Sequence, residues 1–323
     1  MKTINWGSIG CGDVCERKSG PALYGVENSR LIAVTRRDRG KGEDFAKRHN
    51  VPKYYATTDE LLADAEIDAI YVATPGAEHY EPTVAAAGAG KHVLCEKPMA
   101  RNADECRRMI DICNEAGVEL GIAYYRRCYP IIMKVKELID AGTYGAVKEI
   151  RINDEFPLSH RLDLIHYFCG DIAAVSSRNE ELPPGSHAAE GGVLYARTKA
   201  GPVGVMNIGW GEKRAPETVF VTCENGGINV DDLKAGELSI ESEGRTEKQS
   251  FGAPAATHWG LVENFVQHLN GNADLACDGE EGRKSTVILD YVSLLENDGA
   301  EIEADYDRPP RPRTDDDAKK LLG

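Results

Sequence analysis

Short apolar runs alternate with helical patterns along the first 124 residues of the chain. Capping residues mark the expected helix starts, such as Thr58 before Asp59-Glu60 and Asn102 before Ala103-Asp104-Glu105. Short strands that alternate with helices are typical of a doubly wound parallel sheet. We therefore expect an α/β domain over residues 1–124. The apolar runs occupy residues 4–9, 30–34, 53–56, 67–73, 91–97 and 118–124.

The pattern changes after residue 124, and strand-like alternation dominates from residue 193 onward. Residues 193–198 and 203–208 predict one hairpin, and Asn225-Gly226 predicts a primed turn in another. Helices are expected over residues 258–269 and 281–295. The pattern indicates a second, α+β domain over residues 125–323 with a largely antiparallel open sheet. Residues 308–323, rich in proline and aspartate, predict a mobile tail or a strap over a neighbour.

Composition narrows the class of protein. The 323 residues suit two domains, and the net charge of 38 − 53 = −15 argues against binding to nucleic acid or to an anionic membrane. The nine cysteines include no Cys-x-x-Cys pair and no metal-ligand spacing, so we expect reduced thiols and no metal. No apolar leader or membrane-length run is present, so we expect a cytoplasmic protein.

The first apolar run leads into Gly10-Cys11-Gly12-Asp13-Val14-Cys15, a glycine-rich turn with cysteine at the usual third glycine. Gly10 permits the tight turn, and Gly12 lets a pyrophosphate approach the backbone. The helix that follows presents its N-terminus to phosphate groups. The spacing predicts a dinucleotide site that includes Cys11, Asp13 and Val14, on a Rossmann sheet.

The second apolar run ends in Arg36-Arg37, where NAD-binding chains usually carry a carboxylate. Guanidinium groups suit a 2′-phosphate, so the sequence favours NADP over NAD. Asp38 is the competing evidence for NAD. A solvated charge cluster is the alternative interpretation.

Two later runs end in polar residues at the same predicted edge of the sheet. One ends in Thr74-Pro75 with His79 beyond, and the other in Glu96-Lys97-Pro98. Ligands bind outside the carboxyl ends of parallel strands. We expect Thr74, Pro75, His79, Glu96 and Lys97 to border the cofactor. A helix-start role for His79 and a surface ion pair for Glu96 and Lys97 are the structural alternatives.

These residues, with Gly90-Lys91-His92-Val93 and Tyr125-Arg126-Arg127, resemble the glucose–fructose oxidoreductase / inositol dehydrogenase / MocA family. The resemblance implies a nucleotide-binding domain and a second domain that forms the substrate wall. It implies that Lys97 contacts the substrate, and that the histidine of a His-x-x-Asp pattern, here His160 with Asp163, also takes part. The chain departs from the family at Phe156, where an aspartate is common.

The resemblance implies hydride transfer between a sugar-like or polyol carbon and the nicotinamide. His160 is then the candidate base and Lys97 stabilises the alkoxide. Asp163 orients His160 or has a structural role. Tyr125 and Arg126 contact the substrate or pack between domains.

Two alternatives remain open at this point, an NAD-dependent glycosidase and a non-catalytic nucleotide-binding regulatory protein. His166, His187 and His258 carry no motif and are unassigned. The strand-rich second domain favours a homodimer or homotetramer.

Overall fold

The computed structural model describes residues 1–153, 158–181, 190–208, 217–295 and 299–310. Phe156, His187 and residues 311–323 of the expected tail lie outside these ranges. The chain forms two compact units, the first of Met1–Cys128 with Pro254–Thr286, the second of Tyr129–Ala253 with the chain from Val287 onward. The first break is close to the expected boundary at residue 124. Residues 254–286, however, group with the first unit and not with the second.

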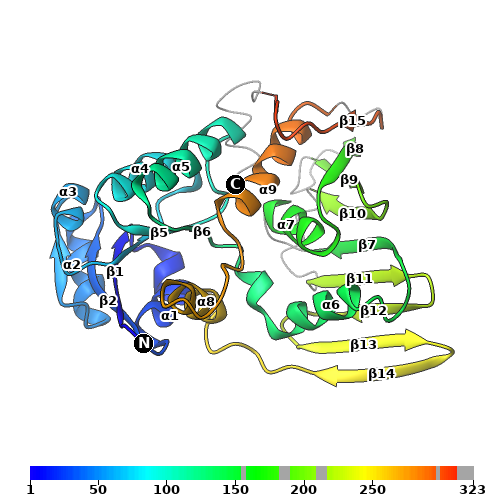
Figure 1. Cartoon of the computed structure of the whole chain (residues 1–323), viewed down its shortest axis with the longest axis horizontal. Helices are drawn as coiled ribbons and strands as arrows, with labels where there is room; N and C mark the ends of the chain where they lie inside the picture. Colours follow the sequence, from blue (N-terminus) through cyan, green and yellow to red (C-terminus); the bar gives the residue numbers. More distant parts are fainter. Residues whose placement is uncertain (154–157, 182–189, 209–216, 296–298, 311–323) are drawn as a thin grey trace. The chain divides into compact units, whose positions relative to one another are not determined.

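The first unit contains a six-stranded parallel sheet with the strand order β3-β2-β1-β4-β5-β6. Figure 1 labels β1, β2, β5 and β6 of this sheet. This is the Rossmann order, and the expected doubly wound α/β fold is confirmed. The direction of winding reverses between β1 and β4, and in open α/β sheets ligands bind outside the carboxyl ends of the strands at such a point. The strands are β1 Ile4–Ile9, β2 Ser29–Thr35, β3 Lys53–Tyr55, β4 Ala69–Val72, β5 His92–Cys95 and β6 Leu120–Ile122.

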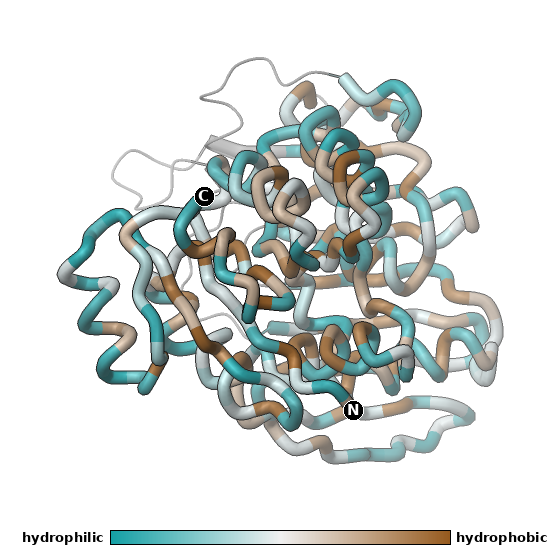
Figure 2. The backbone as a smooth tube through the Cα atoms, turned by 60° about the vertical axis from the view of Figure 1, so that its left-hand side comes forward, coloured by the Kyte–Doolittle hydropathy of each residue, from teal (hydrophilic) through white to brown (hydrophobic). Residues whose placement is uncertain are grey.

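The central strands are buried on both faces, as parallel strands between two helical layers must be. Every residue of β4 is buried, and so are all but the first residue of β5. In Figure 2 hydrophobic and hydrophilic residues alternate along the helices, which is the pattern of helices that pack one face. The first unit contains η1 Cys15–Ser19, α1 Gly20–Gly25, α2 Arg39–Arg48, α3 Thr58–Leu62, η2 Gly76–Glu78, α4 Tyr80–Gly88, α5 Ala103–Ala116, η3 Tyr125–Cys128 and α8 Trp259–Leu269.

Two predicted helix caps can be compared with the structure. Asn102 caps α5 as expected, because its side chain accepts from the Glu105 N–H. The expected cap at Thr58 was wrong by one residue. Thr57 accepts from the Glu60 N–H, and Glu60 reaches back to complete a capping box.

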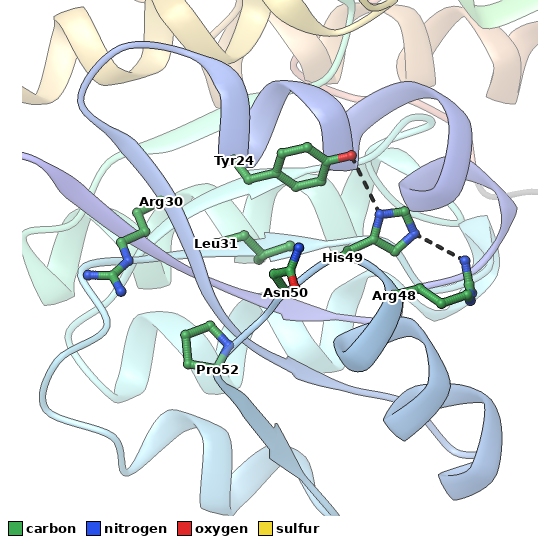
Figure 3. Close-up of a pocket in the computed structure, with 7 residues that line it drawn as sticks. All are labelled: Tyr24, Arg30, Leu31, Arg48, His49, Asn50 and Pro52. Atoms are coloured by element: carbon green, nitrogen blue, oxygen red, sulfur yellow. Dashed lines mark hydrogen bonds between the residues drawn. The ribbon is translucent and has the colours of Figure 1, made fainter.

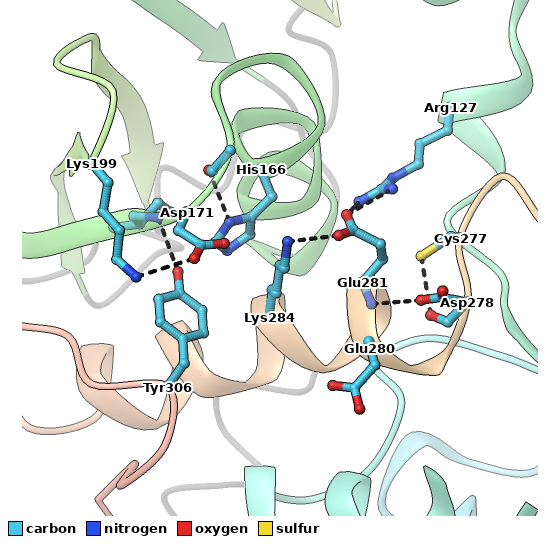
Figure 4. Close-up of polar contacts among 12 residues, drawn as sticks. Arg127, His166, Asp171, Lys199, Cys277, Asp278, Glu280, Glu281, Lys284 and Tyr306 are labelled. Carbon is cyan, nitrogen blue, oxygen red and sulfur yellow. Dashed lines mark hydrogen bonds and ion pairs between the residues drawn. The ribbon is translucent and has the colours of Figure 1, made fainter. Parts of the chain in front are cut away.

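The closing helices complete the core of the first unit. Phe265 of α8 packs on Trp6 of β1, with ring centroids 5.3 Å apart. Helix α9 (Gly279–Val292) begins in this unit, and Glu281 near its start receives hydrogen bonds from buried Arg127 of η3 at 3.2 Å (Figure 4). Residues 254–286 therefore belong to the same packed body as the parallel sheet.

The second unit contains a nine-stranded sheet with the order β14-β13-β12-β11-β7-β10-β9-β8-β15. Among the described residues of this sheet, only β7 and β10 pair in parallel, so the expected largely antiparallel sheet is confirmed. Helix α7 (Leu158–Cys169) packs against these two strands and against α6 (Pro130–Asp140). The strands are β7 Val147–Asn153, β8 Ile172–Glu181, β9 Glu190–Thr198, β10 Val203–Ile208, β11 Thr218–Cys223, β12 Gly226–Val230, β13 Glu237–Ser242, β14 Arg245–Ser250 and β15 Ile302–Glu303.

The hairpin of β11 and β12 lies where Asn225-Gly226 predicted it, but its turn differs. Cys223 pairs with Gly226, so the connecting residues are Glu224 and Asn225. Neither has a positive φ, and the prediction of a primed turn was therefore wrong. None of the helices in the described ranges combines the length and the apolar content that crossing a bilayer demands.

Candidate functional site

The glycine-rich turn lies at the carboxyl end of β1. Gly10 has a φ of +88°, its N–H donates to Thr35 O at 3.0 Å, and a Cβ there would lie 2.6 Å from Ala73 O. A Cβ on Gly12 would meet nothing within 4 Å. The turn is therefore packed tightly at Gly10 and open at Gly12. An open backbone at this position leaves room for a pyrophosphate.

Cys15 occupies the place of the third glycine. Its side chain is buried, and Sγ donates to Gly10 O at 3.4 Å. Burial raises the pKa of the Cys15 thiol to about 12, although contacts with Ser19 and Ser8 lower it. Cys15 is thus a neutral packing residue beneath the turn and is not a nucleophile.

The helix after the turn begins with free backbone donors. The Glu16 N–H bonds to Gly12 O at 3.0 Å, so the N–H groups before it precede the helical ladder. Asp13 and Val14 were expected to contact the cofactor. The Asp13 carboxylate is exposed and forms an ion pair with Arg17, which leaves the backbone as the part that suits a phosphate.

Arg36 and Arg37 follow the last residue of β2 and differ in environment. Arg36 Nη1 donates to Cys11 O at 2.8 Å, so its guanidinium braces the glycine-rich turn. Arg37 is 82% exposed and lies 3.5 Å from a Glu78 carboxylate oxygen. Asp38, the evidence for NAD, caps α2 by accepting from the Lys41 N–H at 3.1 Å. Its carboxylate therefore has a structural partner.

His79 joins the ends of two strands. Nε2 lies 2.9 Å from Thr74 O, and Nδ1 lies 2.8 Å from Pro98 O. Burial lowers the pKa of the ring, despite its two carbonyl neighbours, and a neutral imidazole donates only one of these bonds. Both nitrogens face backbone oxygens, so His79 holds the Thr74-Pro75 turn against the segment after Lys97. We expected it to border the cofactor.

Glu96 and Lys97 come directly after β5, and the peptide bond between Lys97 and Pro98 is cis. The Glu96 carboxylate is buried and accepts three hydrogen bonds. Oε1 accepts from Tyr71 Oη at 2.5 Å and from His258 Nε2 at 2.8 Å, and Oε2 accepts from the Lys97 N–H at 3.1 Å. This carboxylate was expected to bind the cofactor. The structure places it in a buried network with Tyr71 and His258.

The charge on Glu96 follows from its partners. Burial raises the pKa of this carboxyl group, but the hydrogen bond and charge of His258, the charge of Lys97 and the bond from Tyr71 together lower it to about 2. Glu96 is therefore an anion across the working range of pH. Because an anion only accepts hydrogen bonds, His258 Nε2 carries the shared hydrogen.

The Lys97 side chain, directly after this anion in the chain, is partly buried. Burial lowers its pKa, the charge of Glu96 raises it, and the charges of Lys18 and Arg126 lower it further, with a net decrease. Among the described residues the ammonium donates no hydrogen bond. A lysine in this setting can donate to a substrate oxygen.

The residues after β6 divide between packing and polar roles. The Tyr125 ring lies 4.6 Å from the His258 ring, and its side chain is buried. Arg126 is buried as well, and its charge acts on Lys97. Arg127 bonds to Glu281, as described above. The aromatic face of Tyr125 therefore supports the network around Glu96.

His160 and Asp163 lie on α7 in the second unit, one turn apart and both about 1% exposed. Arg161, between them, donates to Asn207 O of β10. Every side chain from Leu158 to His166 is buried, so α7 is covered all round. Both members of the pair therefore lie on a buried helix.

Metal-ligating side chains, cysteines and a cavity were the other candidate features of the described residues. No cluster of metal-ligating side chains occurs within the described ranges, and no disulfide joins any of the nine cysteines, which all lie in these ranges. A cavity of about 370 Å³ lies beside the amino end of β2 (Figure 3), at the opposite end of this strand from Thr35 and the glycine-rich turn. It is therefore separate from the expected nucleotide edge. Its lining residues are Tyr24, Arg30, Leu31, Arg48, His49, Asn50 and Pro52.

Two functional candidates were missed in the sequence. Tyr71 lies within an apolar strand, and His258, just before α8, is 162 residues from Glu96 in the chain. Neither residue carries a local signal, because the network exists only after the closing helices have packed on the sheet.

Comparisons with known proteins agree with this fold. An oxidoreductase named P35 from Formosa agariphila is 29% identical over 317 residues, which cover 89% of this chain and 97% of that protein. A protein named D-xylose 1-dehydrogenase (NADP+) 2 from Haloferax volcanii is 27% identical, with coverage of 93% and 99%. The solved structure of an oxidoreductase from Agrobacterium radiobacter, in complex with NAD+, L-tartaric acid and magnesium, shares the fold. Its TM-score is 0.83 at 16% identity, with coverage of 94% and 98%.

Residues 4–124 match the family model GFO_IDH_MocA, described as an oxidoreductase family with an NAD-binding Rossmann fold. The matched residues include the glycine-rich turn, the Thr74-Pro75 turn and Lys97, which carried the resemblance in the sequence. Over residues 4–124, the chain is therefore similar to this oxidoreductase family.

Proposed function

We propose that this protein is an NAD(P)-dependent dehydrogenase or reductase that transfers a hydride between the nicotinamide and a CH–OH carbon of a sugar-like or polyol substrate. The observation that carries the proposal is the placement of Lys97. This lysine follows the buried Glu96 anion directly after β5, at the same sheet edge as the open backbone of Gly12. The name of the Haloferax volcanii relative, a D-xylose 1-dehydrogenase, supports the substrate class.

The residues present fit a dinucleotide. The open backbone at Gly12 suits the pyrophosphate, and the first helical N–H groups at Asp13 and Val14 suit its oxygens. When bound, the nicotinamide supplies the acceptor or donor of the hydride. We propose NADP as the cofactor, with NAD as the alternative, because Arg37 is exposed and Asp38 is committed to a helix cap.

The chain's own residues then have separate tasks. Lys97 donates a hydrogen bond to the substrate oxygen and stabilises the negative charge that develops there. His160 takes the proton of the alcohol as the hydride leaves, and Asp163, one turn away, orients the imidazole. Tyr125 and Arg126 border the substrate. We further propose a cytoplasmic enzyme that forms a homodimer or homotetramer.

The test of this function is a screen of sugars, polyols and their keto forms with NADP+, NAD+ and the reduced cofactors. With the substrate found, Lys97→Ala is expected to lower kcat by about 10²–10³-fold, because the alkoxide loses its charged donor. The affinity for NADPH, measured by nucleotide fluorescence, is expected to stay within a few-fold.

The matched control is Lys134→Ala, which removes a lysine of α6 that pairs with Glu137 at 2.7 Å. It is expected to retain wild-type kcat. Loss of NADPH affinity as large as the loss of kcat in Lys97→Ala would make Lys97 a cofactor anchor. Absence of turnover across the whole panel would reject the proposed function.

A further inference from the structure

The buried carboxylate of Glu96 gathers donors from three separate segments of the first unit. Tyr71 comes from β4, the Lys97 N–H from the residue after Glu96, and His258 from the residue before α8. We propose that His258 is a positioning residue for Lys97, and that it acts through the Glu96 carboxylate. This inference rests on the proposed function, since it gives Lys97 a task in the reaction.

The Glu96 carboxylate is linked to the backbone of Lys97. The Glu96 N–H donates to Val72 O at 2.9 Å, which fixes this residue to β4. Its Oε2 accepts from the Lys97 N–H at 3.1 Å. The carboxylate thus fixes the backbone from which the Lys97 side chain extends. A carboxylate that turned away would release that backbone.

His258 holds the Glu96 carboxylate in place. His258 is 1% exposed, and its ring is supported on one face by the Tyr125 ring at 4.6 Å. Its Nε2–H points at Glu96 Oε1, and its Nδ1 has no hydrogen-bond partner among the described residues. Within the described part of the chain, the polar contact that the ring makes is therefore the bond to Glu96.

The charge around Glu96 depends on the titratable groups that surround it. The other titratable groups around Glu96 are Tyr71, His79, Lys97, Cys15 and Cys95. Burial raises the pKa of Tyr71 and of both thiols, so these three stay neutral. Burial lowers the pKa of His79, which favours a neutral ring. Apart from His258, the remaining group whose positive charge acts on Glu96 is the Lys97 ammonium.

Removal of the His258 donor changes the titration of Glu96 in a known direction. Burial alone raises the pKa of this carboxyl group, and His258 contributes the largest opposing effect. Without it, the pKa of Glu96 rises and the group takes up a proton as the pH falls from neutral. A protonated Glu96 no longer anchors the Lys97 backbone as an anion, so activity is expected to fail at acidic pH.

The experiment compares four variants of the full-length protein. His258→Phe keeps a ring against Tyr125 and removes the donor, whereas His258→Gln restores an N–H donor without the ring. Tyr71→Phe removes the other side-chain donor to Oε1. His268→Ala is the matched control, because His268 lies on the same helix and pairs with a different glutamate, Glu119, at 3.1 Å.

We expect His258→Phe to lower kcat about tenfold to 100-fold, since displacement of a reacting group by about 1 Å costs about 10²-fold. The Kd of NADPH is expected to stay within a few-fold of wild type. The acidic limb of the profile of kcat/KM against pH should move to higher pH in His258→Phe and in Tyr71→Phe. It should return toward its wild-type place in His258→Gln and stay unmoved in His268→Ala.

A second readout does not depend on turnover. At about pH 5, where an ordinary glutamate is mostly ionised, His258→Phe should show the infrared C=O band of a protonated, buried carboxyl group. The wild type and His268→Ala should lack this band, and it should disappear when Glu96→Gln is added. If His258→Phe does not fold, His258→Met takes its place, because it fills similar volume without a donor.

An unmoved acidic limb together with an absent carboxyl band in the His258 variant would overturn the inference. Equal losses of kcat and of NADPH affinity would overturn it too, because His258 would then support the fold of the unit and not Lys97. If the wild type turns over no sugar or polyol, the proposed function fails by itself. The infrared comparison then still decides whether His258 controls Glu96.

Discussion

Adjacent residues of the same type can have different tasks, and Arg36 and Arg37 are an example. The Arg36 guanidinium bonds to the backbone of the glycine-rich turn at Cys11, whereas Arg37 extends into solvent near Glu78. The sequence predicts two equivalent phosphate ligands here. In the structure the Arg37 guanidinium is the exposed one of the two, and it could form two hydrogen bonds to a 2′-phosphate.

Arg37→Ala is therefore expected to raise the Kd of NADPH about tenfold or more and to leave the Kd of NADH unchanged, because charge-assisted hydrogen bonds to a phosphate are lost. Arg36→Ala is expected to weaken both nucleotides, since the turn itself loses support. Fluorescence titration with each nucleotide measures the two effects. Arg39→Ala, which breaks only a surface pair with Glu43, is the control. Equal weakening of both nucleotides by Arg37→Ala would exclude the 2′-phosphate contact.

At the scale of elements, the turn after β1 combines one constrained glycine with one unconstrained glycine. Gly10 has a left-handed φ and lies against Ala73 O, while Gly12 faces open space. The fold therefore needs Gly10 for its backbone, and a ligand needs Gly12 for access. A substitution at Gly10 should therefore change mainly the stability of the fold, and a substitution at Gly12 should change mainly the affinity for the nucleotide.

Gly10→Ala is expected to lower the free energy of unfolding by about 1–3 kcal/mol, the usual cost of a strained backbone conformation. Gly12→Ala is expected to unfold like the wild type in urea and to bind NADPH more weakly, because the new methyl group occupies the place of the pyrophosphate. Urea titration and nucleotide fluorescence on both variants give the comparison. Wild-type NADPH affinity in Gly12→Ala would place the pyrophosphate elsewhere.

The sequence predicted the parallel sheet well, because its strands are continuous apolar runs between polar turns. It did not predict β8 (Ile172–Glu181), whose second half is polar, or the short strand β15. The cap of α3 was misplaced because Thr57 and Thr58 are adjacent and have the same capping chemistry. Lys97 could be selected from its strand end. The residue that holds Glu96 next to it could not be selected, since His258 reaches Glu96 from a distant segment.

At the scale of the whole molecule, the first unit is built from two separate stretches of chain. The parallel sheet comes from the first 128 residues, and the helix that covers part of it comes from residues 254–286. The contact of Phe265 with Trp6, and the close approach of its ring to Gly121, join these stretches through a buried apolar surface.

Phe265→Ala is expected to reduce the free energy of unfolding by about 3–5 kcal/mol, because a fully buried aromatic ring leaves a cavity. Urea denaturation followed by intrinsic fluorescence measures the loss. Met133→Ala, on an exposed side chain of α6, is the control and is expected to change stability little. A Phe265 variant as stable as the control would show that α8 contributes little to the first unit.

The order of synthesis gives this discontinuous unit a particular history. The strands of the sheet leave the ribosome first, yet Trp6 and Gly121 have no cover until Phe265 has emerged much later. The first unit therefore cannot complete its core until the residues of α8 have been translated. A nascent chain that stalls before residue 254 carries a sheet with one apolar surface still open to water and to other chains.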